Sequence, residues 1–343
     1  MTESSPPDAE VVQRSARRDP GLISVISPVL DEADVLEAFH ERVSNALSDW
    51  EFELILVDDG STDRTPQVLE ELAGRDPRVG VVLLSRNFGQ EAAIGAGLDH
   101  ARGDAVVTMD ADLQDPPEVI PKLLARWREG ADVVYAVREA REGEGWLKLA
   151  TSRWFTRIFS RAAGLDIQPG VGDFRLLDRR AVDALRAMPE RARFLRGLSL
   201  WVGFVQSSVP FQRDARFAGR TSYSWRKMLR YSLDALTSFS RAPLHVATLL
   251  GFGVSFLAFL AIPYVIISRV LDVYVEGVST LLFAVLLLGG IQLITLGIIG
   301  EYVSRIYDEV KRRPLYLVRT RLNVEEPRLA RAEDEQTHAE LRG

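Results

Sequence analysis

The sequence predicts an α/β fold with a mainly parallel, doubly wound sheet, followed by a C-terminal pair of membrane-spanning helices. Apolar runs alternate with helical patterns from about residue 22 to 137, as expected for strands and helices in turn. Two runs without any charged residue follow, at 246–268 and 277–300. Hydrophobic residues make up 47% and charged residues 26% of the chain, which excludes a mostly disordered protein.

The strand and helix pattern can be placed element by element. Continuous apolar strands are typical of parallel sheets that are covered on both faces. Thr65 followed by Pro66 predicts a helix N-cap with proline at the first helical position. Strands are expected at 22–27, 52–57, 79–84, 105–109 and 132–137, with helices at 33–47, 65–74, 89–101 and 117–129 between them.

The two charge-free runs are each long enough to cross a membrane. At about 1.5 Å per helical residue, either run spans a hydrocarbon layer about 30 Å thick. Buried core helices are the alternative. Basic residues flank the pair on both outer sides, which predicts a hairpin with both termini in the cytoplasm. These residues are Arg226, Lys227, Arg230 and Arg241 before the first run, and Arg305, Lys311, Arg312 and Arg313 after the second.

These composition changes divide the chain into five expected regions. Two amphipathic helices, at 146–163 and 225–240, are expected within these regions, and they fit either the membrane surface or the core of the soluble domain. The regions are a disordered tail at 1–20, an α/β domain at 21–220, a juxtamembrane amphipathic helix at 221–245, a transmembrane hairpin at 246–302, and a cytosolic C-terminal segment and tail at 303–343.

Charge and composition exclude several functions. The net charge is −6, which argues against a nucleic-acid partner, because such proteins usually present a basic domain. The chain has no Cys, and none of its four His lies at metal-ligand spacing from another. A metal ion would therefore be held by oxygen ligands.

Acidic residues gather where the predicted strands end. The second strand leads into Asp58-Asp59-Gly60-Ser61, and the fourth into Asp110-Ala111-Asp112-Leu113-Gln114. Ligands bind beyond the carboxyl ends of the strands in such sheets. Alternate residues of an extended segment share a face, so the Asp-x-Asp pair suits a divalent cation that substrate phosphates also bind. A lone Asp-x-Asp is more often a solvated turn, but the second acidic motif favours a functional site.

Five motifs together carry a resemblance to a known family. They are P-x-x-x-E at 28–32, D-D-G-S-T-D at 58–63, S-R-N-F-G-Q at 85–90, D-A-D-L-Q-D-P-P-E at 110–118, and G-D-F-R-L-L-D-R at 172–179. The chain resembles a family 2 inverting glycosyltransferase with a GT-A fold. Among these, it is similar to the polyprenyl-phosphate glycosyltransferases, such as bactoprenol glucosyltransferases and dolichol-phosphate mannose synthase. The resemblance extends from about residue 22 to 319, including the apolar runs.

The resemblance implies a role for each matching residue. Mg²⁺ or Mn²⁺ would be held by Asp110, Asp112 and Gln114, and the donor nucleotide by Pro28, Leu30, Glu32, Asp58, Asp59, Asn87, Asp110 and Ala111. Relatives often carry an aromatic residue at the position of Leu30 and Asn at that of Asp31. Catalysis would involve Asp112, Asp173 and Arg138, with Asp173 as a sugar or acceptor contact, a general base or a structural cap. Phosphate and acceptor contacts would be Arg138, Lys148, Arg153, Arg175, Arg216 and Arg220.

The resemblance implies the transfer of a sugar from a UDP-sugar to polyprenyl (undecaprenyl or decaprenyl) phosphate. Resemblance to the bactoprenol glucosyltransferase branch favours glucose as that sugar. The reaction would supply a lipid-linked sugar for the cell envelope, at the cytoplasmic side of a bacterial inner membrane. The expected partners are a UDP-sugar, polyprenyl phosphate, membrane lipid and, by the resemblance, other copies of the chain in a homo-oligomer such as a tetramer. Alternatives are another sugar, a glycolipid acceptor, or a catalytically silent assembly partner.

Overall fold

The computed structural model describes residues 19–138, 171–212 except 189 and 191–194, scattered positions between 244 and 267, and 277–326. The chain divides into two compact units, one built around a sheet and the other containing a long helix. The sheet unit includes residues from both sides of the long helix in the sequence, because it contains 19–138, most of 171–212 and 314–326.

The described residues of the sheet unit form eight strands in the order β7-β5-β6-β4-β1-β2-β3-β8. β1 pairs in parallel with β2 and β4, β2 with β3, and β5 with β7. β6 is antiparallel to both of its neighbours, and β8 is antiparallel to β3. The strands are β1 (Ile23–Val29), β2 (Phe52–Asp58), β3 (Val79–Leu84), β4 (Ala105–Thr108), β5 (Val133–Arg138), β6 (Val171–Asp178), β7 (Gln206–Phe211) and β8 (Val318–Leu322).

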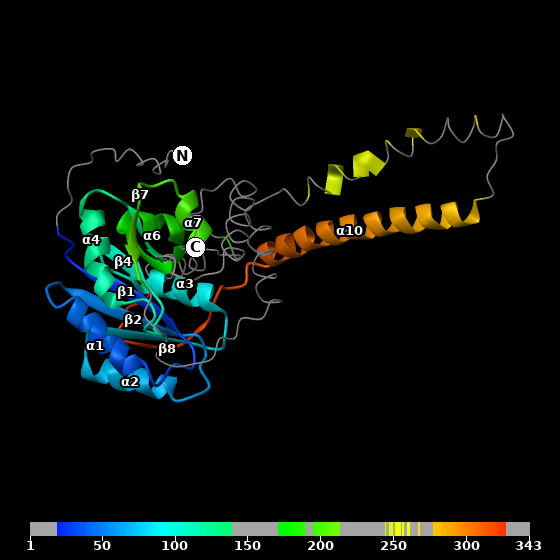
Figure 1. Cartoon of the computed structure of the whole chain (residues 1–343). Coiled ribbons are helices and arrows are strands. Elements are labelled where there is room, and N and C mark those ends of the chain that lie inside the picture. The colour runs from blue at the N-terminus through cyan, green and yellow to red at the C-terminus, as the bar shows by residue number, and fades with distance from the viewer. Residues whose placement is uncertain are drawn as a thin grey trace, which may run out of the picture. The chain divides into compact units, whose positions relative to one another are not determined.

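Helices cover both faces of this sheet (Figure 1). The apolar side chains of α1, α2 and α4 share one core with the strand residues of one face, which include Ile23, Leu54 and Val81. On the other face, α3 packs so closely on β1 that a Cβ at Gly97 would lie 2.2 Å from Ile26. The helices are α1 (Leu36–Ala46), α2 (Thr65–Arg75), α3 (Gln90–His100), the 3₁₀ turn η1 (Pro117–Val119), α4 (Ile120–Arg128), α6 (Arg179–Arg186) and α7 (Leu195–Trp201).

The predicted strands and helices up to residue 138 are confirmed, with boundaries that differ by a few residues. Five elements are not predicted from the sequence, namely β6, α6, α7, β7 and β8. β6 carries Asp173 and Arg175 inside the sheet unit, where both side chains are buried, and charged residues obscure the apolar pattern of a strand. β8 has only five residues and contains two arginines, so it does not stand out from a polar tail. The sequence instead predicts a separate cytosolic segment in this region.

The predicted N-cap at Thr65 is wrong. The helix α2 begins at Thr65 itself, and the backbone N–H of Thr65 donates to the Asp63 carboxylate at 2.8 Å. The Thr65 hydroxyl instead accepts a hydrogen bond from the backbone N–H of Glu32 at 2.9 Å. Thr65 therefore ties the loop after β1 to the start of α2.

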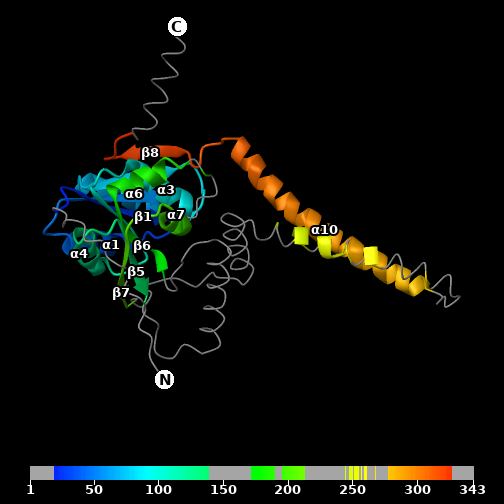
Figure 2. The same ribbon diagram turned by 90° about the horizontal axis from the view of Figure 1, so that it is seen from above.

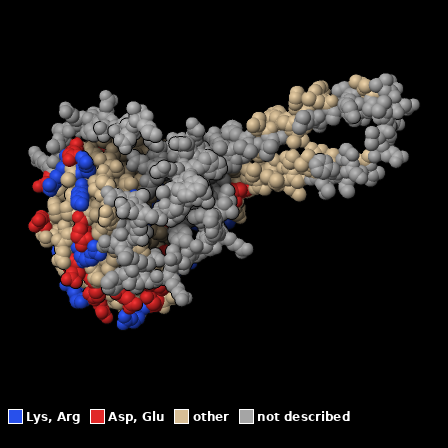
Figure 3. Space-filling view, in the orientation of Figure 1, with Lys and Arg blue, Asp and Glu red and all other residues tan. Residues whose placement is uncertain are grey.

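The second unit contains α10 (Val278–Val310), a helix of 33 residues. Its stretch from Leu287 to Val310 is the one segment among the described residues that is long and apolar enough to cross a membrane. Figure 3 shows the described atoms of this helix free of acidic and basic side chains over most of its length, whereas both kinds are mixed over the sheet unit. The expected second span thus lies in a continuous helix.

The remaining membrane predictions concern residues that mostly lie outside the described part of the chain. Only scattered positions of the expected first span, 246–268, are among the described residues, so the two-span hairpin stays a prediction. The two amphipathic helices at 146–163 and 225–240 lie outside the described residues.

Candidate active site

The polar residues that the sequence singled out meet at one edge of the sheet. The carboxyl ends of β1, β2, β3 and β4 lie there because these strands are parallel. β6 runs antiparallel beside β4, with Arg175 opposite Thr108, so its first residues reach the same edge. The arrangement gathers loops from five strands at the place where doubly wound sheets bind ligands.

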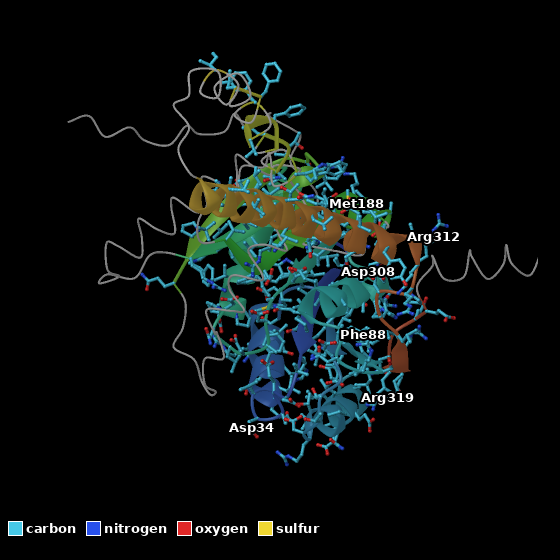
Figure 4. The ribbon with its side chains drawn as sticks, turned by 90° about the vertical axis from the view of Figure 1, so that its right-hand side faces the viewer. Asp34, Phe88, Met188, Asp308, Arg312 and Arg319 are labelled. Carbon is cyan, nitrogen blue, oxygen red and sulfur yellow. The ribbon has the colours of Figure 1, made fainter. Side chains whose placement is uncertain are left out.

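The loops after β2 and β3 are fastened to each other by Asp59. Its buried carboxylate accepts hydrogen bonds from the backbone N–H groups of Phe88 at 2.7 Å and Gly89 at 2.9 Å. Burial raises the pKa of Asp59, although these two bonds act in the opposite direction. The ring of Phe88, a residue labelled in Figure 4, also lies under the Arg86 guanidinium, and the distance from Cζ of Arg86 to the ring centre is 4.1 Å. Asp59 therefore fixes the 85–89 loop.

The neighbouring carboxylates shape the loops after β1 and β2. Asp58 is fully buried and accepts from the backbone N–H of Ser61 at 3.1 Å. Asp31 has a positive φ of 53°, and its carboxylate accepts a hydrogen bond from the backbone N–H of Thr62 at 2.7 Å. The backbone N–H of Asp31 in turn donates to the hydroxyl of Ser61. The acidic side chains at this part of the edge thus organise backbone N–H groups.

The loop after β4 concentrates negative charge. Asp110 accepts from the side-chain amide of Gln90 at 2.9 Å, and Asp112 accepts from the backbone N–H of Gln114 at 3.1 Å. Burial, and then the charges of Asp173, Asp115 and Asp112, raise the pKa of Asp110 to about 7. The buried Asp115 carboxylate lies 3.6 Å from the Arg138 guanidinium. A cation beside this loop would relieve the repulsion among its carboxylates.

Asp173, at the start of β6, is held between two arginines. Its carboxylate accepts from Arg196 of α7 at 2.8 and 2.7 Å and from Arg175 at 3.1 Å. Burial alone would raise the pKa of Asp173, but these ion pairs outweigh burial and lower it. Asp173 also lies 3.4 Å from the amide nitrogen of Gln90, which links the pair to the loop after β4.

Comparison with known proteins identifies the family to which these motifs belong. A sequence profile described as glycosyl transferase family 2 matches residues 24–186. An uncharacterized glycosyltransferase of Synechocystis sp. is 45% identical over 299 residues, covering 86% of this chain and 94% of that protein. A bactoprenol glucosyl transferase of Shigella phage SfII is 41% identical over 300 residues, covering 87% of this chain and 97% of that protein.

The chain belongs to glycosyl transferase family 2. It is a glycosyltransferase, and its mixed α/β, mostly parallel sheet is the GT-A-like fold that the sequence predicted. Among solved structures, a glucosyl-3-phosphoglycerate synthase from Mycobacterium tuberculosis, in complex with Mn²⁺, UDP and phosphoglyceric acid, is 22% identical with a TM-score of 0.48. That similarity covers 63% of this chain and 78% of that one.

In this family 2 glycosyltransferase, the residues expected to bind the nucleotide lie along the loops after β1 to β4. Leu30 is 42% exposed, and Asn87 is exposed in the 85–89 loop. Pro28 and Glu32 are half-buried, whereas Ala111 is buried beside the acidic pair. Asp58 and Asp59 are buried and bonded to backbone N–H groups, so their role in the structure is to shape the loops. Contact with a nucleotide stays a prediction for all of these residues.

The arginines expected to contact phosphate differ in their accessibility. Arg138 is half-buried at the end of β5, and its guanidinium passes over Gly172, where a Cβ would lie 3.0 Å from it. Arg175 is 2% exposed and donates to Leu195 O, Ser199 Oγ, Gly172 O and Asp173, which argues against direct contact with a phosphate. Lys148, Arg153, Arg216 and Arg220 lie outside the described residues.

Sequence reasoning missed several residues of the site. Arg196 holds Asp173 from α7, and Gln90 joins Asp110 to Asp173. Glu91 accepts from the backbone N–H of Leu195 at 3.2 Å, and burial, followed by the charge of Asp173, raises its pKa to about 7. Gln90 ends the quoted S-R-N-F-G-Q motif, which could have drawn attention to it, whereas nothing in the sequence connects Arg196 with Asp173.

The loop after β4 suits a divalent metal ion bound together with substrate. Among the described residues, no three His, Cys, Asp or Glu side chains converge as a metal-binding group. Asp110 and Asp112 nevertheless supply hard oxygen ligands in a place where negative charge is already crowded. Mg²⁺ and Mn²⁺ sites of this kind complete their coordination with water and phosphate oxygens. Gln114 is buried nearby, and its part as a ligand stays a prediction.

Replacing Gly60 with Ala is expected to destabilise the joined loops. Gly60 has a φ of +78°, and its Cβ would lie 2.5 Å from the backbone carbon of Arg86 and 2.6 Å from the nitrogen of Asn87. We expect the free energy of unfolding to fall by about 1–3 kcal/mol, since the backbone itself must move. Thermal unfolding in detergent measures this loss.

Gly74→Ala is the matched control for that substitution. Gly74 lies in α2, and nothing lies within 4 Å of its Cβ position. Because Ala favours a helix over Gly, this variant should be unchanged or more stable, by up to about 1 kcal/mol. Equal stability of the two variants would contradict the close approach of the loops.

Proposed function

We propose that the chain transfers glucose from UDP-glucose to a polyprenyl phosphate, of the undecaprenyl or decaprenyl type, with inversion at the anomeric carbon. The observation that carries this proposal is the 41% identity to a bactoprenol glucosyl transferase along 97% of that protein's length. A match of this extent covers 87% of the present chain and so reaches beyond the sheet unit into the apolar helix. The product would be a lipid-linked sugar for glycosylation in the cell envelope.

The loops after β1, β2 and β3 would bind the nucleotide. Asp58 and Asp59 hold these loops in place through backbone N–H groups, which leaves Glu32 and Asn87 to contact the ribose and base. Leu30 presents an exposed apolar side chain against which a base can pack. Preorganised loops of this kind lose little conformational entropy when the ligand binds.

The diphosphate would lie against the loop after β4. Asp110 and Asp112, with Gln114, would hold Mg²⁺ or Mn²⁺ there. When bound, the metal ion neutralises the charge that develops on the departing UDP. Arg138, held near Asp115 at the end of β5, would add a fixed positive charge on the same side.

The reaction itself needs little proton transfer. An oxygen of the acceptor phosphate would attack the anomeric carbon, the bond from that carbon to the UDP oxygen would break, and its electron pair would leave with UDP. The acceptor phosphate is mostly dianionic near pH 7, since its second pKa is about 6. The lowered pKa of Asp173 and its two arginine partners fit a residue that stays ionised and orders Arg196, and they do not favour a general base.

The membrane would bring the two substrates together. We propose that α10 is the second helix of a transmembrane hairpin at 246–302, with both termini and the sheet unit in the cytoplasm of a bacterial cell. The isoprenoid tail keeps the acceptor in the bilayer, while the sugar nucleotide is soluble. Anchoring the enzyme confines it to the surface that holds the acceptor, which raises the effective concentration. A homo-oligomer, such as a tetramer, belongs to the same proposal.

A donor and acceptor screen tests this function. The full chain in proteoliposomes would receive UDP-glucose, other UDP-sugars or GDP-mannose together with a short polyprenyl phosphate. We expect a lipid product heavier than the acceptor by one hexosyl group, formed fastest from UDP-glucose. A preference for another donor would show that glucose is not the sugar transferred. A product formed only on a glycolipid would show that polyprenyl phosphate is not the acceptor. The absence of any product with every pair would favour a silent assembly partner.

A further inference from the structure

The segment that follows α10 in the sequence returns to the sheet unit. This return segment, residues 314–326, contains β8, which is labelled in Figure 2. β8 pairs antiparallel with β3. The register changes between Leu83 and Leu84, where Val318 and Thr320 pair on either side of Arg319. Such a bulge bends a strand and is common at sheet edges beside active sites. The bulge therefore lies at the carboxyl end of β3, where the 85–89 loop begins.

The return segment contacts the first residue of this loop directly. The backbone N–H of Ser85 donates to the carbonyl oxygen of Leu317 at 2.8 Å. At the other end of β3, the side-chain amide of Asn323 donates to Val79 O at 3.0 Å and Ala73 O at 2.8 Å. Both ends of β3 are thus fixed by residues that come more than 200 positions later in the chain.

The same segment also holds the far end of α3. The Tyr316 hydroxyl donates to the Asp99 carboxylate at 2.7 Å, and the Arg321 guanidinium donates to Nε2 of His100 at 3.2 Å. Nδ1 of His100 lies 2.7 Å from the carbonyl oxygen of Ala96, so this nitrogen carries the proton and Nε2 is free to accept. Burial lowers the pKa of His100, which favours this neutral form.

The return segment contacts β3 and α3, which are the elements on either side of a loop expected to bind the nucleotide. The 85–89 loop connects β3 to α3, and Asp59 binds its backbone at Phe88 and Gly89. The first residue of α3, Gln90, reaches Asp110 at 2.9 Å. A displacement of β3 or α3 would therefore move both the loop and a partner of the acidic pair.

We infer that the return segment is a positioning element for the donor site, acting through Tyr316, Leu317 and Arg321. It orders the 85–89 loop before the sugar nucleotide binds, so that the nucleotide does not have to order the loop itself. Only residues 311–317 separate α10 from β8. The segment that directly follows the apolar helix in the sequence is therefore also the segment that positions the 85–89 loop. This inference rests on the proposed function for the identity of the donor.

The double variant Tyr316→Phe/Arg321→Gln in the full chain tests the inference. It removes the two side-chain bonds to α3 and leaves every residue of the acidic loop in place. We expect the KM for UDP-glucose to rise roughly tenfold, because two hydrogen bonds that order the loop are lost, while the KM for the polyprenyl phosphate stays the same. We also expect the amides of 85–89 to exchange faster with deuterium in the absence of substrate.

The matched control is Tyr307→Phe/Arg319→Gln, with the same two kinds of substitution. Tyr307 is an exposed residue near the end of α10, and Arg319, labelled in Figure 4, is exposed at the bulge of β8. This variant should match the unaltered chain in both measurements. If the test variant leaves exchange at 85–89 unchanged, or accelerates exchange throughout the sheet, the return segment only completes the fold and the inference is wrong.

The exchange measurement separates this inference from the proposed function. It requires no substrate, so it decides whether the return segment orders the 85–89 loop even if the unaltered chain does not use UDP-glucose. Failure of the unaltered chain to bind UDP would contradict the proposed donor alone. Normal donor use combined with an unaffected loop in the double variant would contradict the inference alone.

Discussion

Asp112→Asn is expected to lower transferase turnover at least about a hundredfold while the protein stays folded. Asp112 lies in the crowded acidic loop after β4, where its carboxylate accepts from the backbone N–H of Gln114. An amide keeps the size of the side chain but gives up the charge that would hold a divalent cation against the departing diphosphate. Turnover of the lipid-linked product measures the loss, and calorimetric titration of Mn²⁺ in the presence of UDP should show correspondingly weaker binding.

Asp34→Asn is the control for this loss. Asp34 is an exposed carboxylate before α1, labelled in Figure 4, and its ion pair with Arg64 is 3.9 Å long. This variant should keep full turnover, because the residue lies outside the acidic loop. Chelation by EDTA should abolish activity of the unaltered chain, and added Mn²⁺ or Mg²⁺ should restore it. Full turnover in excess EDTA would contradict the metal assignment.

Asp173→Ala is expected to cause the largest loss of stability. Removing this buried carboxylate leaves the guanidinium of Arg175, which is itself buried, without its charged partner inside the sheet unit. Breaking a buried ion pair from one side costs about 3–5 kcal/mol in the free energy of unfolding. A shift of the thermal unfolding midpoint, measured in the same detergent as for the unaltered chain, would report it.

Asp183→Ala offers a comparison on the surface. Asp183 is 57% exposed and lies 3.6 Å from Arg179 and 3.5 Å from Arg186, so its ion pairs are solvated. Its loss should cost less than about 1 kcal/mol. If the two variants unfold at the same temperature, the pairing of Asp173 with Arg175 does not stabilise the fold.

The same ion pairs predict how stability depends on acidity. The pKa of Asp173 is lowered from its ordinary value of 3.8 in the folded protein. A carboxylate with a lowered pKa contributes stability above its unfolded pKa and loses it as the pH falls. The difference in stability between the unaltered chain and Asp173→Ala should therefore be constant near neutral pH and shrink below about pH 4.

The sequence was sufficient to predict the first five strands and the acidic edge, for a physical reason. Buried parallel strands are continuous apolar runs, and the residues after them must lie at one edge, so the residue pattern by itself places Asp58 and Asp110 together. The partners of Asp173 could not be predicted in this way. Arg196 reaches it from α7, 23 positions away, and such contacts depend on how helices pack after the sheet has formed.

β8 illustrates the other limit of sequence reasoning. Its residues Val318–Leu322 carry no signal of their own, because a short edge strand with arginines has the composition of a solvated tail. Its place is set by the open edge of β3 and by partners such as Asp99 and His100 on α3. The expectation of a separate cytosolic C-terminal segment at 303–343 therefore overlooks the strand that covers the edge of β3.

The position of β8 after α10 in the sequence also imposes an order of events during synthesis. β3 ends at Leu84 and its partner begins at Val318, so 233 residues must be translated between them. At about 5–20 residues per second, the ribosome needs roughly 12–47 s for that stretch. During this interval, the apolar helix emerges and the edge of β3 has no strand beside it. The nascent sheet therefore stays open at the edge of β3 until β8 has left the ribosome.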